Sequence, residues 1–273
     1  MVSLETTSCG VTNLCKETEN QYMQNKYLLE CCVDSVESAI AAAEGGADRL
    51  ELCAALIIGG ISPSPALFEQ VRKSCDLPIR VLLRPRFGDF LYTDHEFAII
   101  KREVEIYRES DADGIVIGCL TPDGSLNMEQ MAELIKAAGD MKITLHRAFD
   151  VCADPLLAYR QAAELGIDTI LTSGQEKDCL TGMPLLNKLC AMQNRTGGPH
   201  IMAGAGVTPD VIRQFLANTE ITHYHLSAKK IIDSGMCYRK EDVPMGLPVM
   251  NEYSIYRTDS HIVKEAKDLL NTL

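Results

Sequence analysis

The stretch LLECCVDSVESAIAAAEGGADRLELC, from Leu28 to Cys53, contains one complete unit of the repeat that decides the fold. It holds an apolar run typical of a β-strand, a segment with helical spacing, and a second strand-like run. Each run carries a glutamate with a cysteine two residues later, Glu30 with Cys32 and Glu51 with Cys53. Because alternate residues of a strand share a face, each carboxylate and its thiol point to the same side.

The same alternation of strand and helix recurs along the whole chain. Eight apolar runs have strand character: LLECCV, RLELC, PIRVLLRP, GIVIGCL, KITLHRAF, TILTSG, HIMAGAGV and THYHLSA. Strands alternating with helices form parallel sheets with right-handed crossovers. Eight such units fill about 250 residues in a TIM barrel. We therefore predict an α/β protein with a single-domain (β/α)₈ TIM barrel. A doubly wound sheet, the alternative, usually has a glycine-rich turn after its first strand, where this chain has VDSVES.

The two ends of the chain differ in character from the middle. Residues 1–26 are polar and lack the basic start and apolar core of a signal peptide, so we predict a flexible N-terminal extension. The barrel domain is predicted to occupy residues 27–273. After the eighth strand, a loop rich in proline and glycine is expected to lead into a final helix from about Asp259 to Leu270.

Composition and charge narrow the class of protein. No apolar run among the 273 residues is long enough to cross a bilayer. The formal net charge is −12 and is spread along the chain, which argues against nucleic acid or an anionic membrane as a partner. The 11 cysteines are odd in number and include no CxxC pair, so free thiols in a reducing cytosol are expected.

Polar residues gather on one face of the predicted strands. The opposite face carries residues such as Leu29, Leu50 and Val81, which suit the layer between barrel and helices. The polar face is therefore expected to point into the barrel, toward the carboxyl ends of the strands, where barrel active sites are built. The candidate catalytic residues at this end are Glu30, Glu51, Arg84, His146, Asp150 and His225.

Two interpretations of this polar set stay open. Enclosed carboxylates need partners, and Arg84 and the histidines are expected to neutralise Glu30 and Glu51. In the first interpretation, the set is a closed ion network that only fixes the register of the barrel. In the second, it serves an enzyme of the lyase, isomerase or hydrolase type, with His146 or Glu51 as the proton shuttle.

The second interpretation requires an anionic or phosphorylated small substrate, and further residues suit one. MAGAGVTPD, from residue 202 to 210, is a glycine-rich turn that ends at a helix N-terminus, where backbone N–H groups receive anions. The RPRFGDF run adds guanidinium groups that match oxyanions. The candidate anion-binding residues are Arg86, Gly204, Gly206 and Ser227.

The cysteine pair forms a separate candidate site. Cys32 and Cys53 lie on neighbouring predicted strands, which are about 4.8 Å apart in a regular sheet. Two thiolates at this range suit a soft ion, Cu(I) before Zn(II), because zinc prefers four ligands. The alternative is that both are small core residues that bind nothing. Cys31 points to the other face.

Several blocks of the chain resemble the CutC copper homeostasis proteins. The similarity runs in order from about Tyr27 to the C-terminus. It rests on LLECCVDSVESAIAAAEGGADRLELC, VLLRPRFGDFLYT, ITLHRAFDVCADP, ILTSGQ and HLSAKKIIDSGM. This chain departs from the family pattern by the additional Cys31 and by the apolar run Leu56-Ile57-Ile58 before Gly59-Gly60.

The resemblance implies a TIM barrel with a role in copper homeostasis. It implies Cu(I) bound by two cysteines, which match Cys32 and Cys53 here. It further implies a homo-oligomer, a dimer or tetramer, in the cytoplasm and, in eukaryotes, also in the nucleus. The copper ion and a second copy of the chain are thus the expected partners.

Overall fold

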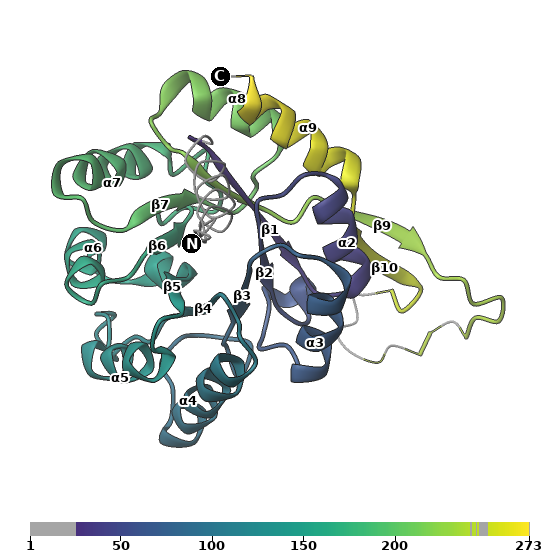
Figure 1. The fold of residues 1–273 in the computed structure, drawn as a ribbon, viewed down its shortest axis with the longest axis horizontal. Helices are drawn as coiled ribbons and strands as arrows, with labels where there is room; N and C mark the ends of the chain where they lie inside the picture. Colours follow the sequence, from purple (N-terminus) through teal and green to yellow (C-terminus); the bar gives the residue numbers. More distant parts are fainter. Residues whose placement is uncertain (1–25, 241, 244, 246–250, 273) are drawn as a thin grey trace, which may run out of the picture.

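Eight parallel strands close into a barrel in the order β1 to β8 (Figure 1). The computed structural model describes residues 26–240, 242–243, 245 and 251–272. The barrel strands are β1 (Leu28–Val33), β2 (Arg49–Leu52), β3 (Ile79–Leu82), β4 (Gly114–Ile117), β5 (Lys142–Leu145), β6 (Thr169–Thr172), β7 (His200–Ala203) and β8 (His223–Leu226). The predicted (β/α)₈ architecture is confirmed. The predicted extension lies, up to residue 25, outside the described residues.

Helices surround the barrel on the outside (Figure 1). They are α2 (Val36–Glu44), α3 (Pro65–Ser74), α4 (Asp94–Glu109), α5 (Met128–Ala138), α6 (Pro155–Glu164), α7 (Met183–Thr196), α8 (Pro209–Asn218) and α9 (Ser260–Asn271). Short 3₁₀ turns, η1 (Leu56–Ile58) and η2 (Arg147–Val151), follow β2 and β5. None of the helices in the described ranges combines the length and apolar character that a bilayer crossing requires.

The helix starts follow from local capping chemistry. Thr93 accepts a hydrogen bond from the Glu96 amide while the Glu96 carboxylate accepts one from the Thr93 amide, which completes a capping box. Three further helices begin with a capping side chain followed by proline: α3, α6 and α8.

The last segment of the chain closes the helical ring. The helix α9, yellow in Figure 1, lies between α8 and α2 and packs against both. Lys267 Nζ lies 2.6 Å from Asp48 Oδ1, and the same carboxylate accepts a hydrogen bond from the Leu29 amide. A hairpin of β9 (Lys229–Asp233) and β10 (Ser254–Thr258) precedes α9, where the sequence predicted only a loop. The residues of β9 are all exposed, so this strand packs no face against the core. Its sequence therefore lacks the alternation of apolar and polar residues that predicts a strand.

The core has two layers, because alternate residues of each barrel strand point outward to the helices or inward to the barrel interior. The outer layer lies between strands and helices and contains the predicted apolar face together with Cys31. The inner layer fills the barrel and includes a small cluster of Cys32, Cys53, Leu82 and Val116, against which Leu56 packs. The interior also contains buried charged and hydroxyl side chains, which surround the candidate site.

Candidate functional site

Cys32 and Cys53 approach each other inside the barrel. Their Sγ atoms are 3.8 Å apart, and both residues are buried. The strand register places Cys32 opposite Glu51, so Cys53 lies one level further toward the carboxyl end. The hydrogen bond with Cys53, and then burial, raise the pKa of Cys32 well above its usual value. Cys32 is therefore a protonated thiol at neutral pH, and a metal ion bound there would have to displace this proton.

Glu30 lies at the centre of a buried ion network. Arg49 Nε donates to its Oε2 across 2.5 Å, and His225 Nδ1 lies 2.9 Å from its Oε1. Burial alone would raise the pKa of Glu30, but the Arg49 charge and the His225 hydrogen bond outweigh burial and hold it far below its usual value. Glu30 is therefore ionised, and both of its oxygens have partners.

Glu51 and His225 connect this network to the thiols. His225 Nε2 lies 3.4 Å from Glu51 Oε2, so one imidazole bridges two carboxylates. Burial raises the pKa of Glu51, and the charges of Glu51 and Glu30 raise the pKa of His225 against the opposing effect of burial. Ligand atoms of Cys32, Glu51 and His225 all lie within 4.8 Å of one another. A soft sulfur donor thus adjoins a carboxylate and an imidazole.

The expectation that Arg84 neutralises Glu30 and Glu51 is wrong. Arg49 pairs with Glu30, and Arg84 instead donates to the carbonyl oxygens of Gly60 and Gly88. Arg49 precedes Glu51 by two residues, so the strand alternation that identified the glutamate already placed this arginine inside the barrel.

A second inward arginine, Arg80, was also missed. It donates to the hydroxyls of Thr144 and Thr169, at 2.5 and 3.1 Å. It lies four residues before Arg84, on the same face of β3 and nearer the amino end of the strand. Both arginines lie at the level of the predicted glutamates, because the strand register pairs Arg49 with Glu30 and Arg80 with Glu51.

His146 and Arg84 form a second polar group around Phe90. The His146 ring centroid is 4.7 Å from that of Phe90, and the Arg84 guanidinium carbon is 4.9 Å from the Phe90 centroid. His146 Nδ1 accepts a hydrogen bond from the Ala148 amide, so the neutral ring carries its proton on Nε2. Burial and the Arg84 charge lower the pKa of His146 to about 3. The ring is therefore neutral at physiological pH.

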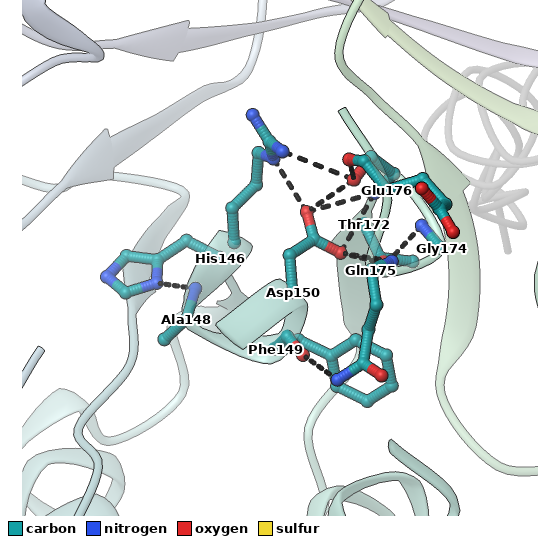
Figure 2. Close-up of polar contacts among 10 residues, drawn as sticks. His146, Ala148, Phe149, Asp150, Thr172, Gly174, Gln175 and Glu176 are labelled. Atoms are coloured by element: carbon teal, nitrogen blue, oxygen red, sulfur yellow. Dashed lines mark hydrogen bonds and ion pairs between the residues drawn. The ribbon is translucent and has the colours of Figure 1, made fainter. Parts of the chain in front are cut away.

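Asp150 lies in a third place and faces the end of β6. Its oxygens accept hydrogen bonds from the hydroxyls of Thr172 and Ser173 and from the amides of Ser173 and Gln175. Arg147 Nε lies 2.6 Å from Oδ2. Figure 2 shows the Asp150 carboxylate directed at Thr172 and Gln175, while the His146 ring points away from it. The structure thus distributes the six candidate catalytic residues over three places.

Each candidate anion-binding residue has a contact or a backbone conformation within the protein that accounts for it without an anion. Arg86 pairs with Glu96 and Asp89, so nearby carboxylates neutralise its charge. A side chain at Gly204 would meet Leu171 at 2.4 Å, which explains this glycine by packing. Gly206 has a φ of +78°, a conformation that glycine adopts freely. The backbone oxygen of Ser227 accepts a hydrogen bond from Thr258.

These features together define a TIM-barrel protein with a buried cysteine pair beside a carboxylate–imidazole network. Residues 27–230 match the model of the CutC family, and the chain belongs to this family. It is 40% identical to the human copper homeostasis protein cutC homolog over 236 residues, which is 86% of each chain. It is 39% identical to the mouse homolog over 251 residues, covering 90% of this chain and 92% of the relative.

A solved structure supports the same assignment. The CutC protein from Streptococcus agalactiae superposes with a TM-score of 0.68 at 25% sequence identity. The match covers 74% of this chain and 98% of the bacterial one.

Proposed function

We propose that this member of the CutC family binds one Cu(I) ion per chain through Cys32 and Cys53, as cargo in copper homeostasis. The single observation that carries the proposal is the 3.8 Å separation of two buried Sγ atoms from neighbouring strands. Sulfur is the donor that Cu(I) prefers. The human and mouse relatives are named for copper homeostasis, which supports the same role for this chain.

The surroundings of the pair suit a monovalent soft ion. Leu82 and Val116 share a cluster with the two thiols, and Leu56 packs on it from the turn after β2. This apolar cover limits the access of water and of competing ligands to the sulfur atoms. Because both ligands must be deprotonated, binding releases protons, and affinity rises with pH. The raised pKa of Cys32 also keeps this thiol from reacting as a thiolate.

Cysteine replacements test the proposal directly. Cu(I) is titrated anaerobically against a chromophoric Cu(I) chelator, with wild-type protein and the variants Cys32→Ala, Cys53→Ala and the double variant. Cys31→Ala is the matched control, since Cys31 is equally buried on β1 but belongs to the outer core. We expect loss of the tight site in all three site variants and its retention in the control. Tight one-to-one binding by the double variant would refute the proposal.

A second candidate function is catalysis on a small anionic or phosphorylated substrate. Among the described residues, the buried nitrogens Arg84 Nε and His146 Nε2 have no hydrogen-bond partner. Two such donors beside the Phe90 ring suit an oxyanion, whereas Arg86, Gly204, Gly206, Ser227 and Asp150 stay predictions for this role. A thermal-shift titration with inorganic phosphate and citrate, repeated on Arg84→Gln, tests this candidate. Equal response of both proteins would exclude Arg84 as the anion ligand.

Location and assembly stay predictions from the family resemblance. We expect a cytoplasmic protein, also present in the nucleus of a eukaryotic cell, and a homodimer or homotetramer. Light scattering on the purified chain measures the second expectation, and fluorescence microscopy of the tagged chain measures the first.

A further inference from the structure

We propose a second metal site, for a divalent cation of the zinc class, formed by Cys32 Sγ, a carboxylate oxygen of Glu51 and Nε2 of His225. The site goes beyond the proposed Cu(I) pair, with which it shares only Cys32. Its ligand atoms lie within 4.8 Å of one another. Within the part of the chain that the structure describes, no other three histidine, cysteine or acidic side chains gather as closely.

The distances approach those of a tetrahedral metal centre. Zinc binds imidazole nitrogen and carboxylate oxygen at about 2.0–2.2 Å, so neighbouring tetrahedral ligands lie about 3.3–3.6 Å apart. His225 Nε2 and Glu51 Oε2 are 3.4 Å apart, which is one such edge. The sulfur of Cys32 completes a three-ligand face with a small inward movement. The fourth position is then left to water or another small ligand, as in zinc sites of the catalytic type.

The residues behind the ligands orient them as a metal site requires. A histidine that binds metal usually donates its other ring N–H to a carboxylate, which fixes the tautomer and the ring plane. His225 Nδ1 lies 2.9 Å from Glu30 Oε1 and can donate its proton there, and Nε2 faces Glu51, where loss of its proton on metal binding would supply the lone pair for the ion. Arg49 in turn holds Glu30 in its ionised form. Glu30 therefore supports the His225 ligand, and Arg49 supports Glu30.

Charge balance favours a divalent ion at these three ligands. A cysteine thiolate and the Glu51 carboxylate carry two negative charges, which one divalent cation cancels. Glu30 and Arg49 cancel each other behind the imidazole. Because an uncompensated charge is costly in a buried place, the neutral arrangement is stabilised there. The mixture of sulfur, nitrogen and oxygen donors fits zinc and excludes calcium and magnesium, which bind oxygen ligands.

The shared sulfur makes the two metal sites mutually exclusive. Cys32 Sγ cannot complete both sites at once, whereas Cys53 belongs to the thiol pair alone and lies outside the three-ligand group. Cu(I) loading is therefore expected to release zinc, and each site has a residue whose removal leaves the other intact.

Titrations of the full chain with Zn²⁺ alone, against a chromophoric chelator, test the site. Co²⁺ then serves as a spectroscopic probe, because a cobalt–thiolate bond gives a near-ultraviolet charge-transfer band. We expect one Zn²⁺ per chain and a thiolate band in the wild type. In Glu51→Gln, we expect Zn²⁺ affinity to fall at least tenfold with Cu(I) binding retained, which also shows that the variant is folded.

The reciprocal variant keeps the proposal falsifiable and separates it from the Cu(I) proposal. Cys53→Ala is expected to bind Zn²⁺ like the wild type while it loses tight Cu(I) binding, and Cys32→Ala loses both. One equivalent of Cu(I) is expected to release the Zn²⁺ from the wild-type protein. Unchanged Zn²⁺ affinity in both Glu51→Gln and Cys32→Ala, or simultaneous retention of Zn²⁺ and Cu(I), would overturn the shared site. Failure of Cu(I) binding alone would overturn only the thiol pair.

Discussion

Arg49 donates from Nε to Oε2 of Glu30 across 2.5 Å inside the barrel, between two neighbouring strands whose register places these residues opposite each other. Glu30 is fully buried, and Arg49 is 7% exposed. Arg49 thus holds the negative charge of Glu30 in place beside His225. Both the carboxylate–imidazole network and the proposed zinc site depend on His225 in this position.

Removal of one partner of this pair is expected to be costly. Arg49→Met leaves the buried Glu30 carboxylate with His225 as its remaining partner, and breaking a buried ion pair typically destabilises a protein by about 3–5 kcal/mol. The double variant Arg49→Met/Glu30→Gln removes the charge as well and is expected to recover more than half of that loss. Urea denaturation of the wild type, both single variants and the double variant measures the coupling. Additive effects would show that the two residues act independently.

The neutral His146 predicts an acid-sensitive fold. Its pKa is lowered to about 3 in the folded protein, whereas a free histidine titrates near 6.5. The unfolded chain therefore binds more protons between these values, so the free energy of unfolding falls as the pH drops below 6.5. Between pH 7.5 and 5.0 this residue alone accounts for a loss of about 2 kcal/mol.

His146→Asn is the variant that isolates this effect. Asparagine offers an acceptor for the Ala148 amide but does not titrate. Urea denaturation at pH 7.5 and 5.0 is expected to show a smaller loss in the variant, by about 2 kcal/mol. An equal pH dependence in both proteins would mean that His146 is not held in its neutral form.

Asp150 is expected to act on stability and not on copper binding. It accepts hydrogen bonds from two hydroxyls and from two amides at the end of β6, and its side chain is 6% exposed. Asp150→Ala leaves several of these donors unpaired, so the free energy of unfolding is expected to fall by about 3 kcal/mol. Cu(I) stoichiometry is measured on the same sample and is expected to stay unchanged. A variant of wild-type stability would show that this carboxylate is free to serve a substrate.

Gly60 links the turn after β2 to the thiol pair. A Cβ at this position would lie 2.8 Å from a Leu82 methyl group and 3.3 Å from the Cys53 Cβ, both closer than ordinary contacts, and the residue has a φ of +84°. Gly60→Ala is therefore expected to displace Cys53 and to weaken Cu(I) binding by about tenfold, which corresponds to about 1.4 kcal/mol. A chelator competition titration measures the change.

Gly59→Ala is the matched control for this prediction. Gly59 has a similar φ of +89°, but its added Cβ would meet only Arg84 Nη1, at 3.4 Å. Both variants are expected to lose about 1–2 kcal/mol of stability from the left-handed backbone. Only Gly60→Ala is expected to change Cu(I) affinity. Equal affinities in the two variants would show that the turn does not control the thiol pair.

The strand alternation predicted much of the interior. It placed Glu30, Cys32 and Glu51 inside the barrel because neighbours two residues apart share a face, and the packing agrees. The same two-residue period places Arg49 and Arg80 on the inward face, each two or four residues before a predicted site residue on its strand. It could not show which charges pair, because pairing depends on side-chain reach across strands far apart in sequence: Glu30 meets His225 from the eighth strand.

By itself, the sequence determined the barrel and its inward faces. Eight repeats of strand and helix, most with a capping side chain at the helix start, specify the architecture through local hydrogen bonding and the two-residue period of a strand. Only the tertiary structure decided that His225 stands between two glutamates beside Cys32, and that Arg84 and Asp150 face other partners. The physical reason is closure of the barrel: it joins the first strand to the last and staggers neighbouring strands, so the level of each side chain depends on a register that no local segment contains.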